Sequence, residues 1–331
     1  MRTDRSAAGF GLALALVSAA TFGTSGTFAR ALIDAGWTAG AAVAARVGIA
    51  AVILAIPAAI ALRGRWRAFG RSLPQVGLFG LLAVGGAQLG FFNAVRFLPV
   101  GVALLVEYSG IVLVVLWMWA RHGDRPRRLT VAGATAAAIG LILVLDVASG
   151  GGLSPVGIIW GLVAAVGLAT YYVLSARVDP ELPSVALACG GMAIGAVVLL
   201  LLGVVGLLPL HATYGNVSFG GHEMSWLLPI AGLSLIAAVI SYVSGIGAAR
   251  LLGAPLSSFV GLTEVLFAVL FAWLVLGEFP TLTQAIGGAF IIAGIALVRV
   301  DQLKAAPKPP RAEAPPAHLP EPSLATRGQG A

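Results

Sequence analysis

Charged residues are scarce in this chain. Only 10% of its 331 residues are Asp, Glu, Lys or Arg, whereas 59% are hydrophobic and the mean hydropathy is +0.99. Soluble domains carry about 25% charged residues, and a chain this apolar has too little polar surface to cover a water-soluble core. The composition therefore excludes a soluble globular protein and indicates a chain dissolved in lipid.

Metal-binding and nucleotide-binding motifs are missing as well. The single cysteine, Cys189, has no partner for an internal disulfide. All four histidines lie outside the apolar stretches, and the sequence contains no HExxH motif, no P-loop and no cysteine spacing for zinc. These absences argue against an intramembrane enzyme or an ATP-driven pump, and we expect neither a metal nor a cofactor.

Ten apolar stretches account for the high hydropathy. A helix that crosses a hydrocarbon layer of about 30 Å needs roughly 20 mostly apolar residues. The sequence therefore predicts an all-α integral membrane protein with ten transmembrane helices, at residues 8–29, 37–62, 73–95, 99–120, 129–147, 155–176, 183–208, 225–249, 255–276 and 281–300.

Basic residues are unevenly distributed among the loops. With a cytoplasmic N-terminus, all but three of the 20 Lys and Arg residues face the cytoplasm; Arg30 and Arg96 face outward and Arg46 lies within a span. This pattern predicts a multi-pass protein of the cell inner membrane with both termini cytoplasmic. Because the basic residues alternate with spans, we expect no nucleic-acid partner. A cleaved signal peptide is the alternative for the first span, but it would leave nine spans.

An internal repeat organises these spans. An offset of 154 residues aligns residues 94–144 with residues 248–298 without a gap, and the matches include Arg96 with Arg250, Gly133 with Gly287 and Gly140 with Gly294. The region at 49–56 aligns less well with 194–201. We therefore expect two repeats of five helices, at 8–147 and 155–300, followed by a Pro-rich, disordered cytoplasmic tail at 304–331. Because five is odd, the second repeat is inverted, which suits alternating access.

Three ionisable residues lie deep within predicted spans, namely Arg46, Glu107 and Glu264. Each costs about 2.5–3.5 kcal/mol near the middle of a span, so each needs a reason. At a rise of about 1.5 Å per residue, both glutamates approach the midplane, on corresponding faces of corresponding helices. They either support helix packing, protonated or hydrogen-bonded, or form a site for a substrate ammonium or a coupling proton. Arg46 either pairs with a Glu or holds a substrate carboxylate.

Other polar residues within the spans are also expected to avoid lipid, because a polar group facing hydrocarbon is expensive. They either line a cavity or pack against neighbouring helices. With Arg46, Glu107 and Glu264, the candidate substrate-binding or proton-binding set comprises Gln88, Asn93, Tyr108, Tyr171 and Tyr242.

The repeat, Arg96 to Pro99 and the Gly277-Glu278 pair before the last span resemble the drug/metabolite transporter superfamily, EamA type. Residues 105–110 and 263–265 are similar to the corresponding stretches of threonine/homoserine-type exporters. Members often carry a proline just after these positions, where this chain has Ile111 and Val265. The resemblance implies secondary transport without ATP, commonly efflux of amino acids or related metabolites.

Three hypotheses of function follow. The first is a secondary-active exporter of small metabolites, foremost amino acids, whose partners are the substrate, a coupling proton or solute gradient and the lipid bilayer. The second is an importer or facilitator of a sugar-type or nucleotide-type metabolite on the same fold. The third is a membrane enzyme or assembly factor that transports nothing. The sequence carries no signal for an oligomeric state.

Overall fold

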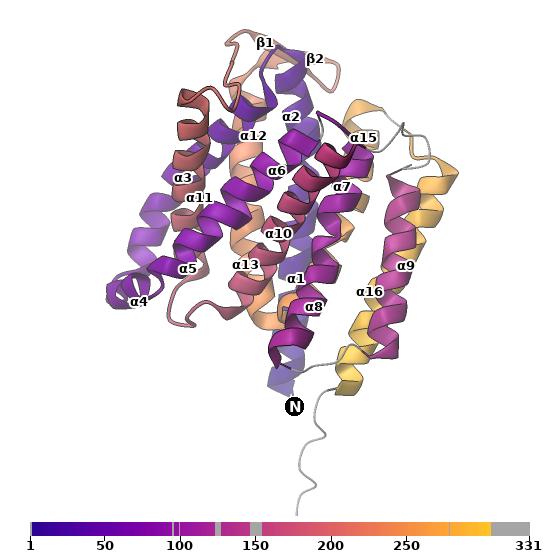
Figure 1. Cartoon of the computed structure of the whole chain (residues 1–331). Coiled ribbons are helices and arrows are strands. Elements are labelled where there is room, and N and C mark those ends of the chain that lie inside the picture. Colours follow the sequence, from indigo (N-terminus) through magenta and orange to yellow (C-terminus); the bar gives the residue numbers. More distant parts are fainter. Residues whose placement is uncertain are drawn as a thin grey trace, which may run out of the picture.

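Apolar runs become helices in this chain because a helix satisfies its backbone hydrogen bonds within the segment, as a lipid environment requires. The computed structural model describes residues 2–94, 96–98, 100–122, 127–145, 154–277 and 279–305. Within these ranges the helices form one bundle, with a short β-hairpin at one end (Figure 1). The N-terminus lies at the opposite end of the bundle. We refer to these two ends as the hairpin face and the N-terminal face.

Nine helical segments among the described residues are long and apolar enough to cross a membrane, so the chain is a multi-pass membrane protein. Some are single helices, and others consist of consecutive elements. In chain order they are α1 (Arg2–Gly23) with α2 (Ser25–Asp34); α3 (Ala39–Ala61); α5 (Leu73–Leu78), η1 (Phe79–Gly86) and α6 (Ala87–Ala94); α7 (Val100–Tyr108) with α8 (Gly110–His122); α10 (Pro155–Arg177); α11 (Ser184–Val204); α12 (Leu227–Ser234), η3 (Leu235–Ile240) and α13 (Ser241–Leu252); α14 (Ala254–Gly261) with α15 (Thr263–Leu276); and α16 (Leu282–Ala305).

The remaining predicted span, at 129–147, corresponds to a shorter apolar helix, α9 (Arg128–Val144), of 17 residues. A separate short helix, α4 (Trp66–Arg71), follows α3 on the N-terminal face. The last helix, α16, runs to Ala305 and so includes two residues of the predicted tail. Residues 306–331 of the predicted tail lie outside the described residues, as do Pro99 and Glu278 of the sequence motifs.

Three spans are broken near their middle, and no proline lies at the breaks. The interruptions fall at Thr24, Ser109 and Leu262. Hydroxyl side chains bond to nearby carbonyls there: Ser109 Oγ donates to Val106 O (2.6 Å) and Thr263 Oγ1 donates to Val260 O (2.7 Å). In this way each hydroxyl group competes with a backbone amide for a carbonyl oxygen, and the regular helix pattern is weakened there.

Two further spans contain π-helical turns. They are η1, within the third span, and η3, within the span that begins at α12. A π-helical turn leaves the i to i−4 ladder locally and is frequent at functional sites. In the 154-residue register, η3 corresponds to residues 81–86 of η1, so both halves of the sequence deviate from regular helix at equivalent places.

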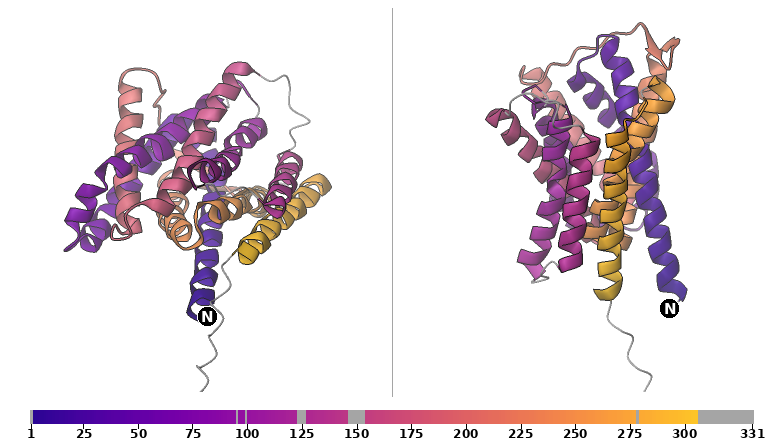
Figure 2. Two further views of the ribbon diagram at one scale, coloured as in Figure 1. Left: turned by 60° about the horizontal axis from the view of Figure 1, so that its bottom comes forward. Right: turned by 90° about the vertical axis from the view of Figure 1, so that its right-hand side faces the viewer.

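Helices α9 and α16 lie side by side at one edge of the bundle (Figures 1 and 2). Glycines set their separation. A Cβ atom added at Gly140 would lie 2.5 Å from Gly287 O, and one added at Gly133 would lie 2.7 Å from Gly294 O. Close backbone approach of this kind is how small residues bring helices together in lipid. Near the N-terminal face the pair is tied by Thr130 Oγ1, which donates to Asp301 Oδ2 (2.6 Å).

The β-hairpin, β1 (Asn216–Phe219) with β2 (His222–Ser225), covers part of its face of the bundle. Phe219 stacks on Phe28 of α2, with ring centroids 5.4 Å apart. Trp37 Nε1 donates to Thr213 O (2.6 Å), and its ring lies 5.7 Å from that of Trp226. Amphipathic aromatic rings favour the membrane–water boundary, so this cluster marks the level at which the bundle leaves the lipid.

A bulky residue at Gly140 is expected to destabilise the α9–α16 pair. In the variant Gly140→Val the new side chain collides with the backbone of α16, and overpacking of this kind costs about 1–3 kcal/mol. We expect a lower melting temperature and less monodisperse protein in detergent, measured by thermal unfolding and size-exclusion chromatography. The matched control is Gly9→Val, because a Cβ at Gly9 meets nothing within 4 Å. Equal stability of the two variants would contradict the glycine contact.

Candidate functional site

One cavity brings together three ionisable groups predicted to lie in the membrane. It has a volume of about 560 Å³ and is lined by Arg46, Gln88, Glu107 and Glu264. Its other walls come from α2, the start of α3 and the end of α6, the parts of these helices that point toward the hairpin face. The cavity therefore runs from the hairpin face to the middle of the bundle. The apolar wall includes Phe22, Val43, Phe91, Phe92, Leu104 and Leu233.

Arg46 is buried, with 6% of its surface exposed, and is held by polar atoms of two other spans. Its Nη1 donates to Ser25 Oγ (3.0 Å) and its Nη2 donates to Ala237 O (2.8 Å). The guanidinium carbon also lies 5.9 Å from the centre of the Phe22 ring, within the range of a cation–π interaction. Arg46 Nε has no hydrogen-bond partner among the described residues.

These contacts bear on the first of the two alternatives for Arg46, direct pairing with a glutamate. Among the described residues, no carboxylate oxygen lies within 4.0 Å of its guanidinium, so Arg46 makes no direct ion pair with Glu107 or Glu264. Glu264 lies close enough to interact with Arg46 electrostatically. The partners that hold the Arg46 guanidinium among the described residues are thus neutral groups.

The π-helical turn η3 supplies one of these neutral groups. Ala237 lies in η3, and its carbonyl oxygen also accepts from Ser241 Oγ (2.8 Å). A carbonyl in a regular helix is occupied by the amide four residues later, whereas a π-helical turn displaces that pattern. A carbonyl oxygen has two lone pairs, so Ala237 O in this turn accepts from both Ser241 and Arg46.

The two glutamates lie next to the broken helices. Glu107 is in the last turn of α7, before the break at Ser109, and Glu264 is the second residue of α15, after the break at Leu262. Both line the same cavity and lie close enough to interact. Glu264 is in the first helical turn, where free amide groups favour a negative charge. The breaks therefore turn both carboxyl groups toward the space between the spans.

Glu264 also borders two further cavities. One, of about 500 Å³, lies between α15 and the ends of α9 and α16, and Tyr108 and Gln284 contribute polar groups to it. The other is a slot of about 10 Å³ on the opposite side of the main cavity from the hairpin, where Ser18, Tyr171 and Tyr172 lie. Glu264 is thus shared by three spaces, whereas Glu107 borders only the main one among those described.

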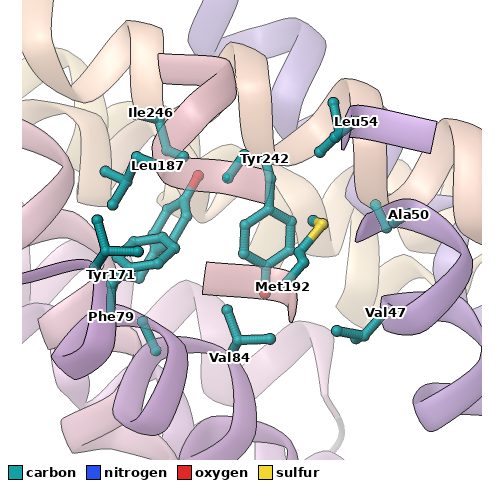
Figure 3. Packing of buried hydrophobic residues seen from close by; sticks show 14 of the residues in the cluster. Val47, Ala50, Leu54, Phe79, Val84, Tyr171, Leu187, Met192, Tyr242 and Ile246 are labelled. Atoms are coloured by element: carbon teal, nitrogen blue, oxygen red, sulfur yellow. The ribbon is translucent and has the colours of Figure 1, made fainter. Parts of the chain in front are cut away.

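The other candidate residues differ in their positions. Gln88 lines the main cavity, and Tyr108 lies beside Glu264. Tyr171 borders the slot. Tyr242 packs in an aromatic cluster with Phe22, Phe79 and Tyr171, in which its ring centroid lies 5.5 Å from that of Tyr171 (Figure 3). It does not line these cavities.

Asn93 is the exception among the candidates. Its side chain donates to Leu89 O (2.9 Å), one turn earlier in the same helix, and it does not line the described cavities. Half-buried amides can satisfy themselves in this way by bonding to a nearby carbonyl. The structure therefore gives Asn93 a local role in the last turn of α6.

Residues 18–27 were missed by the sequence analysis although they carry a signal. The run Ser18 to Thr27 places serine, threonine and glycine in the middle of an apolar span. It contains the break between α1 and α2, the Arg46 partner Ser25 and the slot residue Ser18. Hydroxyls and glycines concentrated at mid-span mark a helix that is interrupted where it lines a cavity.

Broken apolar helices around a cavity with buried charges are the architecture of a membrane transporter. Comparison with known proteins identifies the family. The sequence profile of the EamA-like transporter family matches residues 9–146 and again residues 155–300, so this chain belongs to the EamA-like transporter family.

Individual relatives agree with this assignment. An uncharacterized transporter of Clostridium kluyveri is 25% identical over 230 residues, which cover 68% of this chain and 71% of the relative. An uncharacterized transporter of Archaeoglobus fulgidus is 28% identical over 228 residues, 68% of this chain and 75% of the relative. The uncharacterized inner membrane transporter YicL of Salmonella typhimurium is 22% identical over 232 residues, which cover 69% of this chain and 74% of the relative.

A solved crystal structure shares the fold. It superposes with a TM-score of 0.70 at 21% sequence identity, and the match covers 89% of this chain and 98% of that one. Within the described residues no group of three or more His, Cys, Asp or Glu side chains is placed to hold a metal ion.

Access to the main cavity can be measured by thiol labelling. In a Cys189→Ala background, Ala268→Cys places a thiol in the main cavity and Ala248→Cys places one beside the slot. We expect a membrane-impermeant thiol reagent added from the hairpin face to label Ala268→Cys rapidly and Ala248→Cys slowly, because Ala268 borders the main cavity and the 500 Å³ cavity, whereas Ala248 borders only the slot among the described cavities. Equal labelling rates would contradict an opening at the hairpin face.

Proposed function

We propose that this chain is a secondary-active exporter of small metabolites, foremost amino acids. The observation that carries the proposal is the single cavity in which a buried guanidinium and two carboxyl groups face a common space. Such a site matches a zwitterion. The Arg46 guanidinium, held by neutral partners, receives the carboxylate, while Glu107 or Glu264 receives the ammonium group.

The apolar wall of the cavity suits the remainder of such a substrate. Phe91, Phe92 and Leu104 line it beside the charged groups. Small-molecule sites typically combine a mostly apolar wall with a few polar groups that fix orientation. The resemblance of residues 105–110 and 263–265 to threonine/homoserine-type exporters makes L-threonine the first amino acid to test.

Alternating access is the proposed mechanism, on ten transmembrane helices in two inverted repeats. Equivalent features support this arrangement. The bond from Ser109 to Val106 recurs from Thr263 to Val260, at the 154-residue offset. The contact of Gly133 with Gly294 has its counterpart in that of Gly140 with Gly287, as a two-fold relation between α9 and α16 requires. A pair of inverted repeats can form matching gates on the two sides of a midplane site.

We propose further that the N-terminal face is cytoplasmic in the cell inner membrane. Arg63, Arg65, Arg67 and Arg71 lie between α3 and α5 on this face, whereas Arg30 lies toward the hairpin face. Basic residues in short loops are retained on the cytoplasmic side. The main cavity then opens outward, and export ends with release of substrate from it.

Transport by purified protein in liposomes tests this function. We expect saturable uptake of labelled L-threonine, L-leucine or L-phenylalanine under an imposed pH gradient, reduced about tenfold or more in Glu107→Gln and Glu264→Gln, because a charge-assisted hydrogen bond is worth about 1.5–3 kcal/mol. Glu223→Gln, on the exposed hairpin, is the matched control.

Each outcome of this assay bears on one part of the proposal. Uptake by the Glu107 and Glu264 variants at the rate of the control would remove the carboxyl groups from the site. Failure of the wild-type protein to take up any of the three amino acids would contradict an amino-acid substrate. Uptake that requires a gradient of the opposite direction would favour an importer on the same fold.

A further inference from the structure

The slot below the main cavity contains polar groups that the proposed substrate site does not use. It is lined by Ser18, Tyr171, Tyr172, Ser257 and Glu264, together with small residues of α1, α13 and α14. Its volume of about 10 Å³ is near the minimum space that a single water molecule needs. The slot therefore has the size and the lining of a site for one water.

The Tyr171 hydroxyl is the strongest sign of such a water. It is fully buried, and no atom of the described residues has the geometry to form a hydrogen bond with it. Ser18 Oγ lies beside it and donates to Ser241 O (2.8 Å), which leaves the lone pairs of Ser18 free to accept a hydrogen bond. A buried hydroxyl without a partner costs about 1–3 kcal/mol, and a water bound by Tyr171, Ser18 and Glu264 would remove that cost.

Glycines make room for these hydroxyl groups. A Cβ atom at Gly245 would overlap the Tyr171 hydroxyl, and one at Gly261 would overlap the Tyr172 hydroxyl. Both tyrosines thus fill the space between α10 and the α13–α14 region, which closes the main cavity toward the N-terminal face.

The slot also extends toward the N-terminal face. Ser257 lies three residues after Ala254, the first residue of α14. At a rise of about 1.5 Å per residue, it is therefore about 4.5 Å from the N-terminal end of this helix. Glu264 lies seven residues farther on, at the main cavity. The slot residues therefore occupy the depth between the midplane carboxyl group and the last turn of helix before the N-terminal face.

We propose that a water in this slot, with the hydroxyl groups of Tyr171 and Ser18, forms a proton path between Glu264 and the N-terminal face. The inference rests on the proposed function and assigns a different role to each of the two carboxyl groups. Glu264 carries the coupling proton because it borders both the main cavity and the slot, whereas Glu107 serves the substrate alone.

The proton balance of the path is simple. The protonated Glu264 carboxyl gives its proton to the water, and the water gives one of its own protons to the Tyr171 oxygen. Tyr171 then passes its original proton to Ser18 Oγ, and Ser18 passes its own proton by way of Ser257 to the bulk water at the N-terminal face. Each relay group ends with as many protons as it began with, Glu264 is left as a carboxylate, and one proton has moved toward the N-terminal face.

The charged and titratable groups that face Glu264 come from four spans. They set the charge that the site carries when Glu264 gains or loses its proton, and they comprise Arg46, Glu107, Tyr108, Tyr171, Tyr172 and Tyr242. Arg46 is the cation of this group. A carboxylate at Glu264 is therefore matched by a fixed positive charge across the cavity.

Tyr171→Phe tests the path because it removes one hydroxyl group and keeps the ring. In liposomes with pyranine inside, we expect uptake of labelled L-threonine, L-leucine or L-phenylalanine driven by a pH gradient to fall about tenfold or more in this variant. Exchange of the same amino acid at equal pH on both sides stays within about twofold of wild type, because exchange needs no net proton movement. Ser234→Ala, which removes a buried hydroxyl outside the slot, is the matched control.

The outcomes separate this inference from the proposed function. Wild-type uptake under a pH gradient by Tyr171→Phe would overturn the proton path and leave the exporter intact. If the wild-type protein takes up none of the three amino acids, the proposed substrate class fails, and a high-resolution crystal structure decides the path. A water that bridges the Tyr171 hydroxyl and Glu264, lost in Tyr171→Phe, would support it; a dry slot would overturn it.

Discussion

Every backbone amide and carbonyl that lies in the bilayer must find its partner within the chain, and the rest of this structure depends on that constraint. Straight helices meet it automatically. This chain departs from straight helices at Thr24, Ser109 and Leu262 and in two π-helical turns. At each break hydroxyl groups bond to nearby carbonyls, as Ser109 and Thr263 do. Serine and threonine thus perform at these points what a proline-induced kink performs elsewhere.

The same constraint explains how a guanidinium is kept in the membrane. Arg46 is stabilised by the Ala237 carbonyl of a π-helical turn and by a serine of a broken helix, so both irregularities contribute to its binding. A carboxylate partner would have neutralised it. Because its partners are neutral, the charge is retained inside the cavity that Glu107 and Glu264 also line. Irregular backbone and functional charge therefore occur together for a physical reason.

The two halves of the sequence carry different side chains at equivalent positions. When residues 49–56 are aligned with 194–201, Arg46 corresponds to Gly191, which packs against the Phe79 ring at η1. The π-helical turn η3 thus accepts a hydrogen bond from a cation of α3, whereas η1 places its own aromatic ring, Phe79, against a glycine of α11. The side with the cation faces the open cavity, and the side with the ring lies in the closed hydrophobic core of Figure 3. Different side chains at equivalent positions place a charged site within a symmetric scaffold.

The sequence by itself determined the membrane environment, nine of the long helices and the deep positions of Arg46, Glu107 and Glu264, because hydropathy and span length are local properties of the chain. It also named Gln88 as a candidate, and the structure places this residue at the main cavity. The tertiary structure alone decided that Asn93 bonds to its own helix, that Arg46 binds a carbonyl and Ser25 rather than a glutamate, and that Ser18 borders the slot. These outcomes depend on which helices pack together and on where each helix breaks. Periodicity and composition are silent on both, because contacts between spans join residues that are far apart in the sequence.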